Sequence, residues 1–325
     1  MLLAGDNGAT KTQLALFASP NDLRTPLASA KLTSTSYESF TALVRAFLAD
    51  VHYPITRAVF GVAGPVIDGR VKVTSLPWIV DAHQLQEDLA IPEVHLLNDL
   101  EAIAHAVPVL APYELLTLNA GMPVPHAPIA VAAVGTGLGE AFLLWNGTRY
   151  QVYPSEGGLA NVAPTNAREA ELLASLFSTH SHISYDFLCS GVGIPHIYAF
   201  LKATSDFKEP QWLATQLDSS NDPTQVIVKT ALGDTEPLCV ETLKIFASLL
   251  GAEAGNMALR ILATGGFYIG GGVPPYILPF LQSDAFTHTF TSKGSLSSFM
   301  TSIPVHVILN EMAGVIGAAT YGFML

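Results

Sequence analysis

Two polar residues, Asn98 and Asp99, lie at a predicted junction between a strand and a helix, a position typical of a catalytic carboxylate. Asn98 and Asp99 follow an apolar stretch, and after them Leu100, Ile103 and Val107 recur at helical spacing. A lone carboxylate at a strand-to-helix junction suits a general base in an open α/β sheet, because ligands bind beyond the carboxyl ends of such strands. The alternative is that Asp99 only caps the helix that follows it.

Two glycine-rich turns each separate a pair of predicted strands. They are Asp6-Asn7-Gly8-Ala9-Thr10-Lys11-Thr12 and Gly135-Thr136-Gly137-Leu138-Gly139-Glu140. Small residues let backbone N–H groups approach a phosphate, and Asp6 could position a hydrated Mg²⁺. Neither turn is a Walker loop or a dinucleotide fingerprint, because the first lacks the Gly-Lys-Ser/Thr ending and the second does not open a helix. Their likeness suggests two related half-domains that face one cleft, although an ordinary hairpin remains the alternative for the first.

Three further segments combine small residues with groups that could bind a ligand. Glu156, in a loop with two glycines, could hydrogen-bond a polyol or could simply be a solvated charge. Asp186 lies shortly before another glycine turn. The glycines at 270–272 would form a flat surface, suited either to a purine ring or to tight packing.

Composition limits the class of protein. Half of the 325 residues are apolar and only 13% are charged, and the net charge of −12 argues against nucleic acid or an anionic membrane as the main partner. Cys189 and Cys239 cannot build a disulfide framework or a four-cysteine zinc site, so we expect a cytoplasmic protein. No run of about 18 apolar residues occurs, and the N-terminal apolar run is too short for a signal peptide.

Periodicity predicts a mixed α/β chain. Strands are expected at 2–4, 13–17, 57–62, 71–75, 94–97, 129–134, 141–145, 265–269 and 305–309. Helices are expected at 38–50, 81–90, from 99 onward, and at 168–179, 194–202, 209–217, 222–233, 236–262 and 313–321. Within the long helix, small residues such as Gly251 and Gly255 would permit close packing. The proline-rich stretch 108–128 is predicted to mark a crossing between domains.

The order and spacing of these motifs resemble those of the bacterial-type glucokinases, the ATP-dependent hexokinase group of the actin-like sugar-kinase superfamily. The resemblance extends over nearly the whole chain. The matching motifs are Gly5-Asp6-Asn7-Gly8-Ala9-Thr10, Gly61-Val62-Ala63-Gly64-Pro65, Thr74-Ser75-Leu76-Pro77-Trp78, Leu97-Asn98-Asp99-Leu100-Glu101-Ala102, Gly135-Thr136-Gly137-Leu138-Gly139, Ser155-Glu156-Gly157-Gly158, Gly255-Asn256-Met257-Ala258-Leu259, Gly270-Gly271-Gly272 and Ile303-Pro304-Val305.

The resemblance implies a two-domain actin-like ATPase (ribonuclease H-like) fold of the α/β class, with the active site in the interdomain cleft. A small domain would comprise 1–107, completed by a C-terminal helix at 310–325, and a large domain would comprise 108–309. The implied activity is transfer of the ATP γ-phosphate to the 6-hydroxyl of glucose. The implied partners are a hexose, ATP and Mg²⁺, and the family also suggests a homodimer.

The resemblance also implies roles for individual residues. Asp99 would be the general base, and Asp6 would organise Mg²⁺. The sugar site would comprise Asn98, Asp99, Glu156, Asp186 and the positions of Leu159 and Ser75. The nucleotide site would comprise Asp6, Asn7, Gly8, Ala9 and Thr10, the turn Gly135, Thr136 and Gly137, and, beside the adenosine, Gly271 and Gly272.

Three positions depart from the family pattern. Leu159 replaces a histidine that binds the sugar near its anomeric hydroxyl, Asp186 is one methylene shorter than the usual glutamate, and Ser75 replaces a common asparagine. A lost hydrogen bond to a substrate hydroxyl costs roughly 1–3 kcal/mol. A kinase for another hexose, or a catalytically impaired sugar-binding protein, therefore stands beside glucokinase as an alternative.

Overall fold

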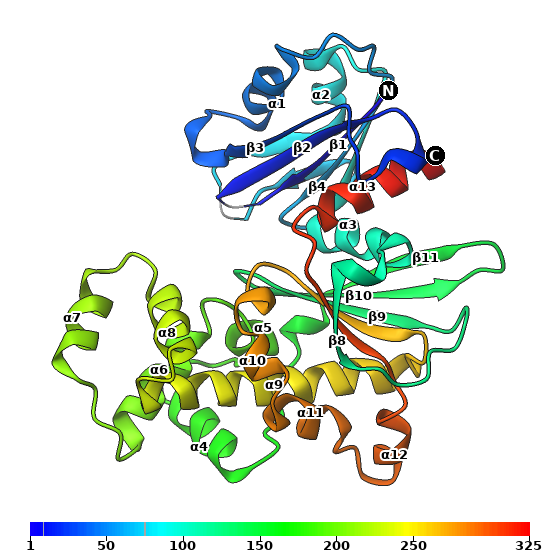
Figure 1. Ribbon diagram of the computed structural model, residues 1–325. Coiled ribbons are helices and arrows are strands. Elements are labelled where there is room, and N and C mark those ends of the chain that lie inside the picture. Colours follow the sequence, from blue (N-terminus) through cyan, green and yellow to red (C-terminus); the bar gives the residue numbers. More distant parts are fainter. Residues whose placement is uncertain (9, 75) are drawn as a thin grey trace. The chain divides into compact units, whose positions relative to one another are not determined.

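The computed structural model describes residues 1–8, 10–74 and 76–325, and the chain divides into two compact units. Unit 1 comprises Met1–Glu114, Val152–Pro154 and Asn310–Leu325, and unit 2 comprises Leu115–Gln151 and Ser155–Leu309. Each unit has its own sheet and helices, so the predicted α/β class is confirmed. We describe the two units separately (Figure 1).

Unit 1 is built on a five-stranded sheet in the order β3-β2-β1-β4-β7. Its strands are β1 (Leu2–Asn7), β2 (Lys11–Phe17), β3 (Ala28–Thr33), β4 (Arg57–Val62) and β7 (Glu93–Asn98), and a small ribbon is formed by β5 (Arg70–Lys72) and β6 (Ile79–Asp81). The strands β1, β4 and β7 are parallel, whereas β2 pairs antiparallel with both β1 and β3. The polar residues that end β1 and β7 therefore lie at one edge of the sheet.

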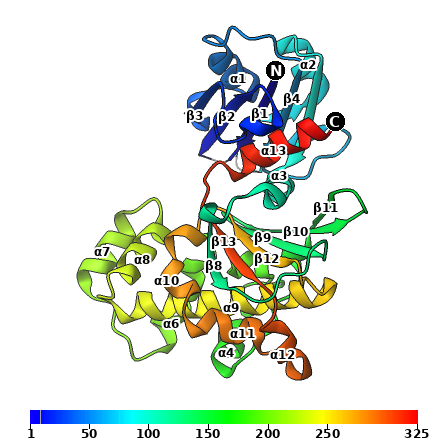
Figure 2. The same cartoon turned by 45° about the vertical axis from the view of Figure 1, so that its right-hand side comes forward.

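Helices cover both faces of this sheet. They are α1 (Phe40–Leu48), α2 (Ala82–Leu89), α3 (Asp99–Ala106) and α13 (Ala313–Met324). Leu3, Phe60 and the α1 residues Phe40 and Leu43 share one apolar core. On the other face α13 packs against β1, β4 and α3, and Figure 2 shows α13 beside α3. Gly317 makes this approach possible, because a Cβ there would overlap the carbonyl of Ala102.

Unit 2 repeats the strand order of unit 1. The six-stranded sheet runs β11-β10-β9-β12-β13-β8 and comprises β8 (Leu115–Asn119), β9 (Ile129–Val134), β10 (Leu138–Trp145), β11 (Tyr150–Ser155), β12 (Gly266–Gly270) and β13 (Val305–Ile308). Only Val152–Pro154 of β11 is assigned to unit 1. As in unit 1, a hairpin (β9 and β10) is followed in the sheet by two strands parallel to its first strand. This repeat agrees with the likeness of the two glycine-rich turns in the sequence.

A long helix forms the centre of the helical layer of unit 2. This helix, α9 (Pro237–Ile261), is surrounded by shorter ones: α4 (Ala167–Leu176), α5 (Tyr185–Leu188), α6 (Ile194–Thr204), α7 (Gln211–Ser219), α8 (Pro223–Leu232), α10 (Leu278–Leu281), α11 (Asp284–Thr291) and α12 (Ser297–Met300). The predicted close packing is confirmed at Gly251 and Gly255, where a Cβ would collide with the carbonyls of Phe286 and Phe290 in α11. Both views show α9 running along the sheet (Figures 1 and 2).

The structure changes two expected boundaries near the glycine-rich turns. The strand β1 continues through Asn7, so Asp6 and Asn7 end a strand instead of forming the tip of a turn. The strand β10 already begins at Leu138, which places Glu140 inside a strand. The elements β3, β6, β8, β11, α5, α10, α11 and α12 were not predicted, because each is short or lacks a clear period.

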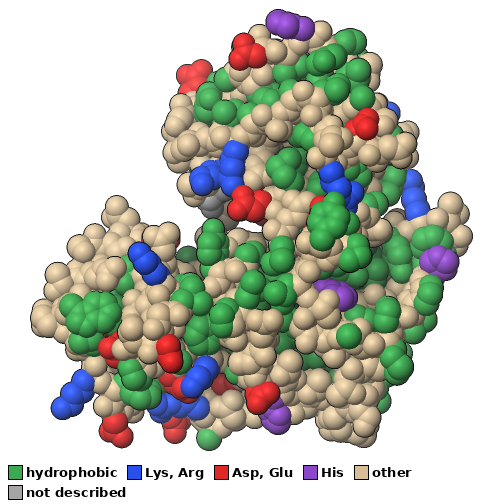
Figure 3. All heavy atoms as spheres, viewed as in Figure 1, with side chains coloured by type: hydrophobic (Ala, Val, Ile, Leu, Met, Phe, Trp, Pro, Cys, Tyr) green, Lys and Arg blue, Asp and Glu red, His purple; other side chains and the backbone are tan. Residues whose placement is uncertain are grey.

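The surface and the helices agree with the composition. Charged side chains are sparse on the face shown in Figure 3, and neither sign gathers there into an extended patch. In the described part of the chain, no helix combines the length and the apolar character needed to cross a membrane.

Candidate active site

Asn98, and not Asp99, caps the helix α3. The Asn98 Oδ1 accepts hydrogen bonds from the backbone N–H groups of Leu100 (3.0 Å) and Glu101 (3.4 Å), and its Nδ2 donates to the carbonyl of Gly64 (3.1 Å). Asp99 is the first helical residue, and its Oδ1 also accepts from Leu100 N–H, at 2.9 Å. The reading of Asp99 as the cap is therefore wrong, and the positive end of the helix dipole favours its ionised form.

Asp6 and Asp99 lie on either side of Gly61. Asp6 pairs with Gly61 in the β1–β4 register, and a Cβ at Gly61 would lie 3.7 Å from both the Asp6 Oδ1 and the Asp99 Cα. Burial, and secondly the charge of Asp99, raise the pKa of Asp6 to about 7. Gly314, in the first turn of α13, also contacts this carboxylate, since a Cβ there would be 2.5 Å from its Oδ2.

This pair of carboxylates suits a divalent cation. Two negative groups that repel each other would be stabilised by a cation, and Mg²⁺ is usually held by one or two carboxylates together with waters and phosphate oxygens. Among the residues that the structure describes, no group of three or more His, Cys, Asp or Glu residues is arranged to hold a metal ion by itself. The residues present fit an open Mg²⁺ site at Asp6.

The first glycine-rich turn is held by hydrogen bonds on its inner side. The Gly8 N–H donates to the Lys11 carbonyl (3.0 Å), the Ser34 hydroxyl donates to the Gly8 carbonyl (3.0 Å), and the Ser34 N–H donates to the Thr10 carbonyl (2.9 Å). The buried side chain of Asn7 points inward and donates to the Thr12 hydroxyl at 2.6 Å. Any contact of Asn7 with a nucleotide would therefore use its backbone. Ala9 and Ser75 lie outside the described residues.

The second glycine-rich turn and the glycines at 270–272 come together in unit 2. They follow β9 and β12, which are neighbouring parallel strands, so both turns lie at the same edge of the sheet. The Val273 N–H donates to the Val134 carbonyl (3.1 Å), and Gly271, at φ +94°, packs against the same carbonyl. Gly271 thus has a structural reason to be glycine.

For Gly135 and Gly272, the described residues give no structural reason for a glycine. Nothing among the described residues lies within 4 Å of a Cβ built at either position, and neither residue has a positive φ. Both lie at the positions predicted to approach the phosphates or the adenosine. A glycine that the chain's own packing does not require leaves space for a ligand to approach the backbone.

Asp186 contacts the second glycine-rich turn directly. Its Oδ1 accepts a hydrogen bond from the Leu138 N–H at 2.7 Å, and a Cβ at Gly137 would lie 2.5 Å from the same oxygen. The Gly191 N–H donates to the Gly135 carbonyl at 2.8 Å. Gly191 was not predicted as a site residue, although the small residues that follow Asp186 were a signal for it.

Glu156 and Leu159 lie on an exposed loop. The short 3₁₀ helix Gly157–Leu159 begins just after Glu156, and the Leu159 N–H donates to the Glu156 carbonyl at 3.0 Å. The Glu156 side chain is exposed, and Leu159 is 51% exposed. Leu159 therefore does not pack into the core.

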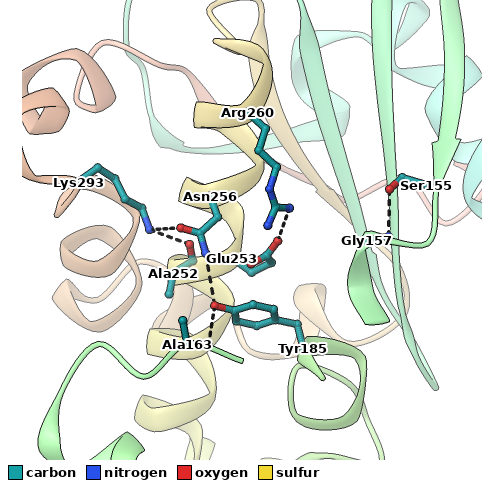
Figure 4. Close-up of polar contacts among 9 residues, drawn as sticks. All are labelled: Ser155, Gly157, Ala163, Tyr185, Ala252, Glu253, Asn256, Arg260 and Lys293. Atoms are coloured by element: carbon teal, nitrogen blue, oxygen red, sulfur yellow. Dashed lines mark hydrogen bonds and ion pairs between the residues drawn. The ribbon is translucent and has the colours of Figure 1, made fainter. Parts of the chain in front are cut away.

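A polar network around the buried Glu253, which the sequence did not predict, lies behind this loop. Glu253, on α9, accepts from Arg260 (2.8 Å) and Asn256 (3.0 Å), and Asn256 also donates to the Tyr185 hydroxyl at 3.3 Å (Figure 4). Lys293 donates to the Asn256 Oδ1 at 2.8 Å. The network fixes Tyr185, the neighbour of Asp186, against the central helix.

Glu140, on the strand β10, lies next to this network and faces Glu253. It is fully buried, and its carboxyl lies against the backbone at Gly157, where a Cβ would overlap its Oε2. Neither of its oxygens has a donor among the described residues, and it faces Glu253, which is itself an acceptor. Two carboxyls can hydrogen-bond only when they share a proton. Burial, and then the charge of Glu253, raise the pKa of Glu140 to about 7.

Glu140→Gln is expected to flatten the dependence of stability on pH. Because the pKa of Glu140 is about 7 in the folded protein and near its usual 4.5 after unfolding, its contribution to stability is complete below about pH 4.5 and is lost as the pH rises to about 7. The loss would be about 3 kcal/mol at most. The neutral glutamine cannot titrate, so the fall in melting temperature between pH 5 and pH 7.5 should shrink. Glu171→Gln, at an exposed site on α4, is the control, and an equal fall in all three proteins would contradict the role of Glu140.

Comparison with known proteins identifies the family of this chain. The family model described as Glucokinase matches residues 3–323. A glucokinase of Nostoc punctiforme is 39% identical, over 98% of each chain. Among solved structures, a glucokinase from an Antarctic psychrotroph superposes with a TM-score of 0.85 at 28% identity, covering 100% of this chain and 99% of that one. The fold is shared, at 20% identity and a TM-score of 0.68, by a ROK family glucokinase from Streptomyces griseus in complex with glucose and AMPPNP, with coverage of 100% and 99%. The resemblance read from the sequence is confirmed: this chain belongs to the glucokinase family.

Proposed function

We propose that this protein is a glucokinase that transfers the γ-phosphate of ATP to the 6-hydroxyl of glucose. One structural observation carries the proposal. Gly135 and Gly272 follow neighbouring parallel strands at the same sheet edge, and the packing of the described residues explains neither glycine. Backbone exposed in this way suits the phosphates and the adenosine of ATP.

Asp99 is the proposed general base. It lies at the positive end of the α3 dipole, which suits a carboxylate, and a carboxylate within reach of the 6-hydroxyl can take its proton as the oxygen attacks phosphorus. Phosphoryl transfer depends mainly on positioning and charge neutralisation, so one base and well-placed donors suffice. The cap formed by Asn98 supports this role, because it fixes the helix end without using Asp99.

Asp6 is the proposed ligand of Mg²⁺, directly or through water. When bound, the cation supplies positive charge against the β- and γ-phosphate oxygens. The backbone N–H groups of Thr10, Thr136 and Gly137 would donate to phosphate oxygens, whereas Gly8 and Ala9 remain proposed contacts by resemblance alone.

Polar side chains are proposed to hold the sugar. Asn98 retains one N–H of its amide for a sugar hydroxyl, the exposed carboxylate of Glu156 can accept from two hydroxyls, and Asp186 can offer its Oδ2. Ser75 remains a proposed contact by resemblance alone. Leu159 offers no polar group to the sugar.

ADP release, measured in a coupled assay with a panel of hexoses, tests the proposal and its alternatives. Glucose-dependent ADP formation with the largest kcat/KM for glucose is the expected result. If kcat/KM were larger for another hexose, that hexose and not glucose would be the preferred substrate. Hexose binding without any ADP release would instead support a catalytically impaired sugar-binding protein.

Leu159→His is expected to lower the KM for glucose, by up to about tenfold, because an imidazole would regain one neutral hydrogen bond of roughly 1 kcal/mol. The half-exposed leucine can be replaced without burying a polar ring, so the melting temperature should not change. Steady-state kinetics and thermal unfolding on the same variant check both points. An unchanged KM in a stable variant would show that position 159 does not face the sugar.

The family also suggests cellular properties, which we include in the proposal. They are a place in glycolysis, a cytoplasmic location and a homodimer. The two cysteines support a reducing compartment, because both are buried and neither is in a disulfide.

A further inference from the structure

Asp186 contacts the second glycine-rich turn (Gly135–Leu138) instead of pointing only toward the solvent. Its Oδ1 is the acceptor for the Leu138 N–H, at 2.7 Å. Leu138 is the first residue of β10, so this bond fixes the point where the turn re-enters the sheet. The contact joins groups 48 residues apart, and it therefore depends on how α5 packs.

The segment that carries Asp186 also holds the other end of this turn. After α5 the chain bends back, and the Gly191 N–H donates to the Gly135 carbonyl at 2.8 Å. Within the turn, the Gly135 N–H donates to the Gly137 carbonyl at 2.9 Å. The turn is thus held at its first residue by Gly191 and at its last by Asp186.

Asp186 is itself held firmly in place. Ser184 caps α5 by accepting from the Phe187 N–H at 3.1 Å, and the neighbouring Tyr185 is buried. The Tyr185 hydroxyl accepts from Asn256 and from the Ala163 N–H, both at 3.3 Å (Figure 4). A carboxylate on so short a side chain, attached to a fixed backbone, can hold its partner with little loss of entropy.

Gly137 leaves room for the Asp186 carboxylate because it has no side chain. A Cβ at residue 137 would come within 2.5 Å of the Asp186 Oδ1, closer than real Cβ contacts allow. Gly135, in contrast, could carry a Cβ without meeting any described atom. Two glycines of one turn therefore differ in kind: Gly137 leaves room for Asp186, and Gly135 leaves room for something outside the chain.

We propose that Asp186 is a positioning residue for nucleotide binding, which holds the Gly135–Leu138 turn in the shape that receives the phosphates of ATP. This inference rests on the proposed function, and it gives Asp186 a task distinct from contacting the sugar. The short side chain fits that task, because the additional methylene of a glutamate would have to be accommodated against Gly137. Removal of the acceptor would leave the Leu138 N–H without its partner and would loosen the turn.

Two measurements made without sugar test the proposal. They are amide hydrogen exchange at Leu138 and the Kd for a non-hydrolysable ATP analogue with Mg²⁺. Asp186→Ala should speed exchange at Leu138 and raise the Kd, each by about tenfold. Asp186→Asn retains an acceptor oxygen, so it should restore both values to within about threefold of the wild type. If Asp186 had only a structural role, its loss would speed amide exchange throughout the core of unit 2, and Asp186→Asn would not restore the wild-type values.

Variants of the glycines in the turn test the same contact without changing Asp186. Gly137→Ala should push the carboxylate away and reproduce both effects, and it should add little in the Asp186→Ala background, since the two changes break one contact. Gly135→Ala should raise the Kd for the analogue but leave exchange at Leu138 unchanged. Wild-type Kd and Leu138 exchange in Asp186→Ala would overturn the positioning role. A wild-type protein that does not bind the analogue would instead contradict the proposed function.

Discussion

Asp99→Asn is expected to abolish phosphoryl transfer and to leave hexose binding within about threefold of the wild type. The amide keeps the size of the side chain but cannot accept the proton of the 6-hydroxyl at neutral pH. Loss of a general base typically costs 10²–10⁴-fold, so kcat should fall by at least about a hundredfold. Rates of ADP release and calorimetric hexose binding measure the two quantities separately.

The structure provides a matched control in the same helical turn. Glu101 lies two residues further along α3, and burial raises its pKa, but it has no proposed role in the reaction. Glu101→Gln should therefore keep kcat within about threefold of the wild type, as expected for a change outside the site. The Asn98 cap is intact in both variants, so α3 should remain folded. A fall of less than about tenfold in Asp99→Asn would mean that Asp99 is not the base.

Gly272→Val is expected to raise the KM for ATP by more than about tenfold without lowering the melting temperature. The side chain would enter a space that no described residue fills, so only a ligand should be excluded. Gly271→Ala, in contrast, should lower the free energy of unfolding by about 1–3 kcal/mol. At residue 271 the φ of +94° and the contact with the Val134 carbonyl tolerate no side chain. Steady-state kinetics and thermal unfolding separate the two kinds of glycine.

The contrast between neighbouring glycines makes this test specific. A stable Gly272→Val variant with unchanged KM for ATP would mean that the nucleotide does not approach this edge of the sheet. A loss of stability in Gly272→Val comparable to that of Gly271→Ala would mean that the open space is filled by the chain itself. Either result would remove the observation that carries the proposed function.

The sequence was sufficient to predict the class of fold and the positions of the main turns. Apolar runs and helical periods located β9, α9 and the junction before α3, because these elements are long or clearly bounded. The first turn was placed too early, since Asp6 and Asn7 continue the ladder of β1 alongside β4. Small polar residues after an apolar run do not reveal where the hydrogen-bonded ladder ends.

The roles of several polar side chains could not be read from the sequence. Asn98 and Asp99 are equally good caps by residue type, and only the geometry assigns the cap to Asn98. The bond from the Leu138 N–H to Asp186 joins two strand-and-helix segments that meet only after packing. Glu140 looked like the end of a turn, whereas it is buried in β10 against the α9 residue Glu253. Such contacts are products of tertiary structure.

Phosphorus NMR of the protein with ATP, Mg²⁺ and glucose tests the central claim most directly. The spectrum identifies the product, and 6-deoxyglucose provides a substrate analogue that lacks only the reacting hydroxyl. We predict loss of the ATP γ-phosphate signal, growth of the glucose 6-phosphate signal, and no sugar phosphate with 6-deoxyglucose. Inorganic phosphate as the only product, or a phosphate on another hydroxyl of glucose, would contradict the account.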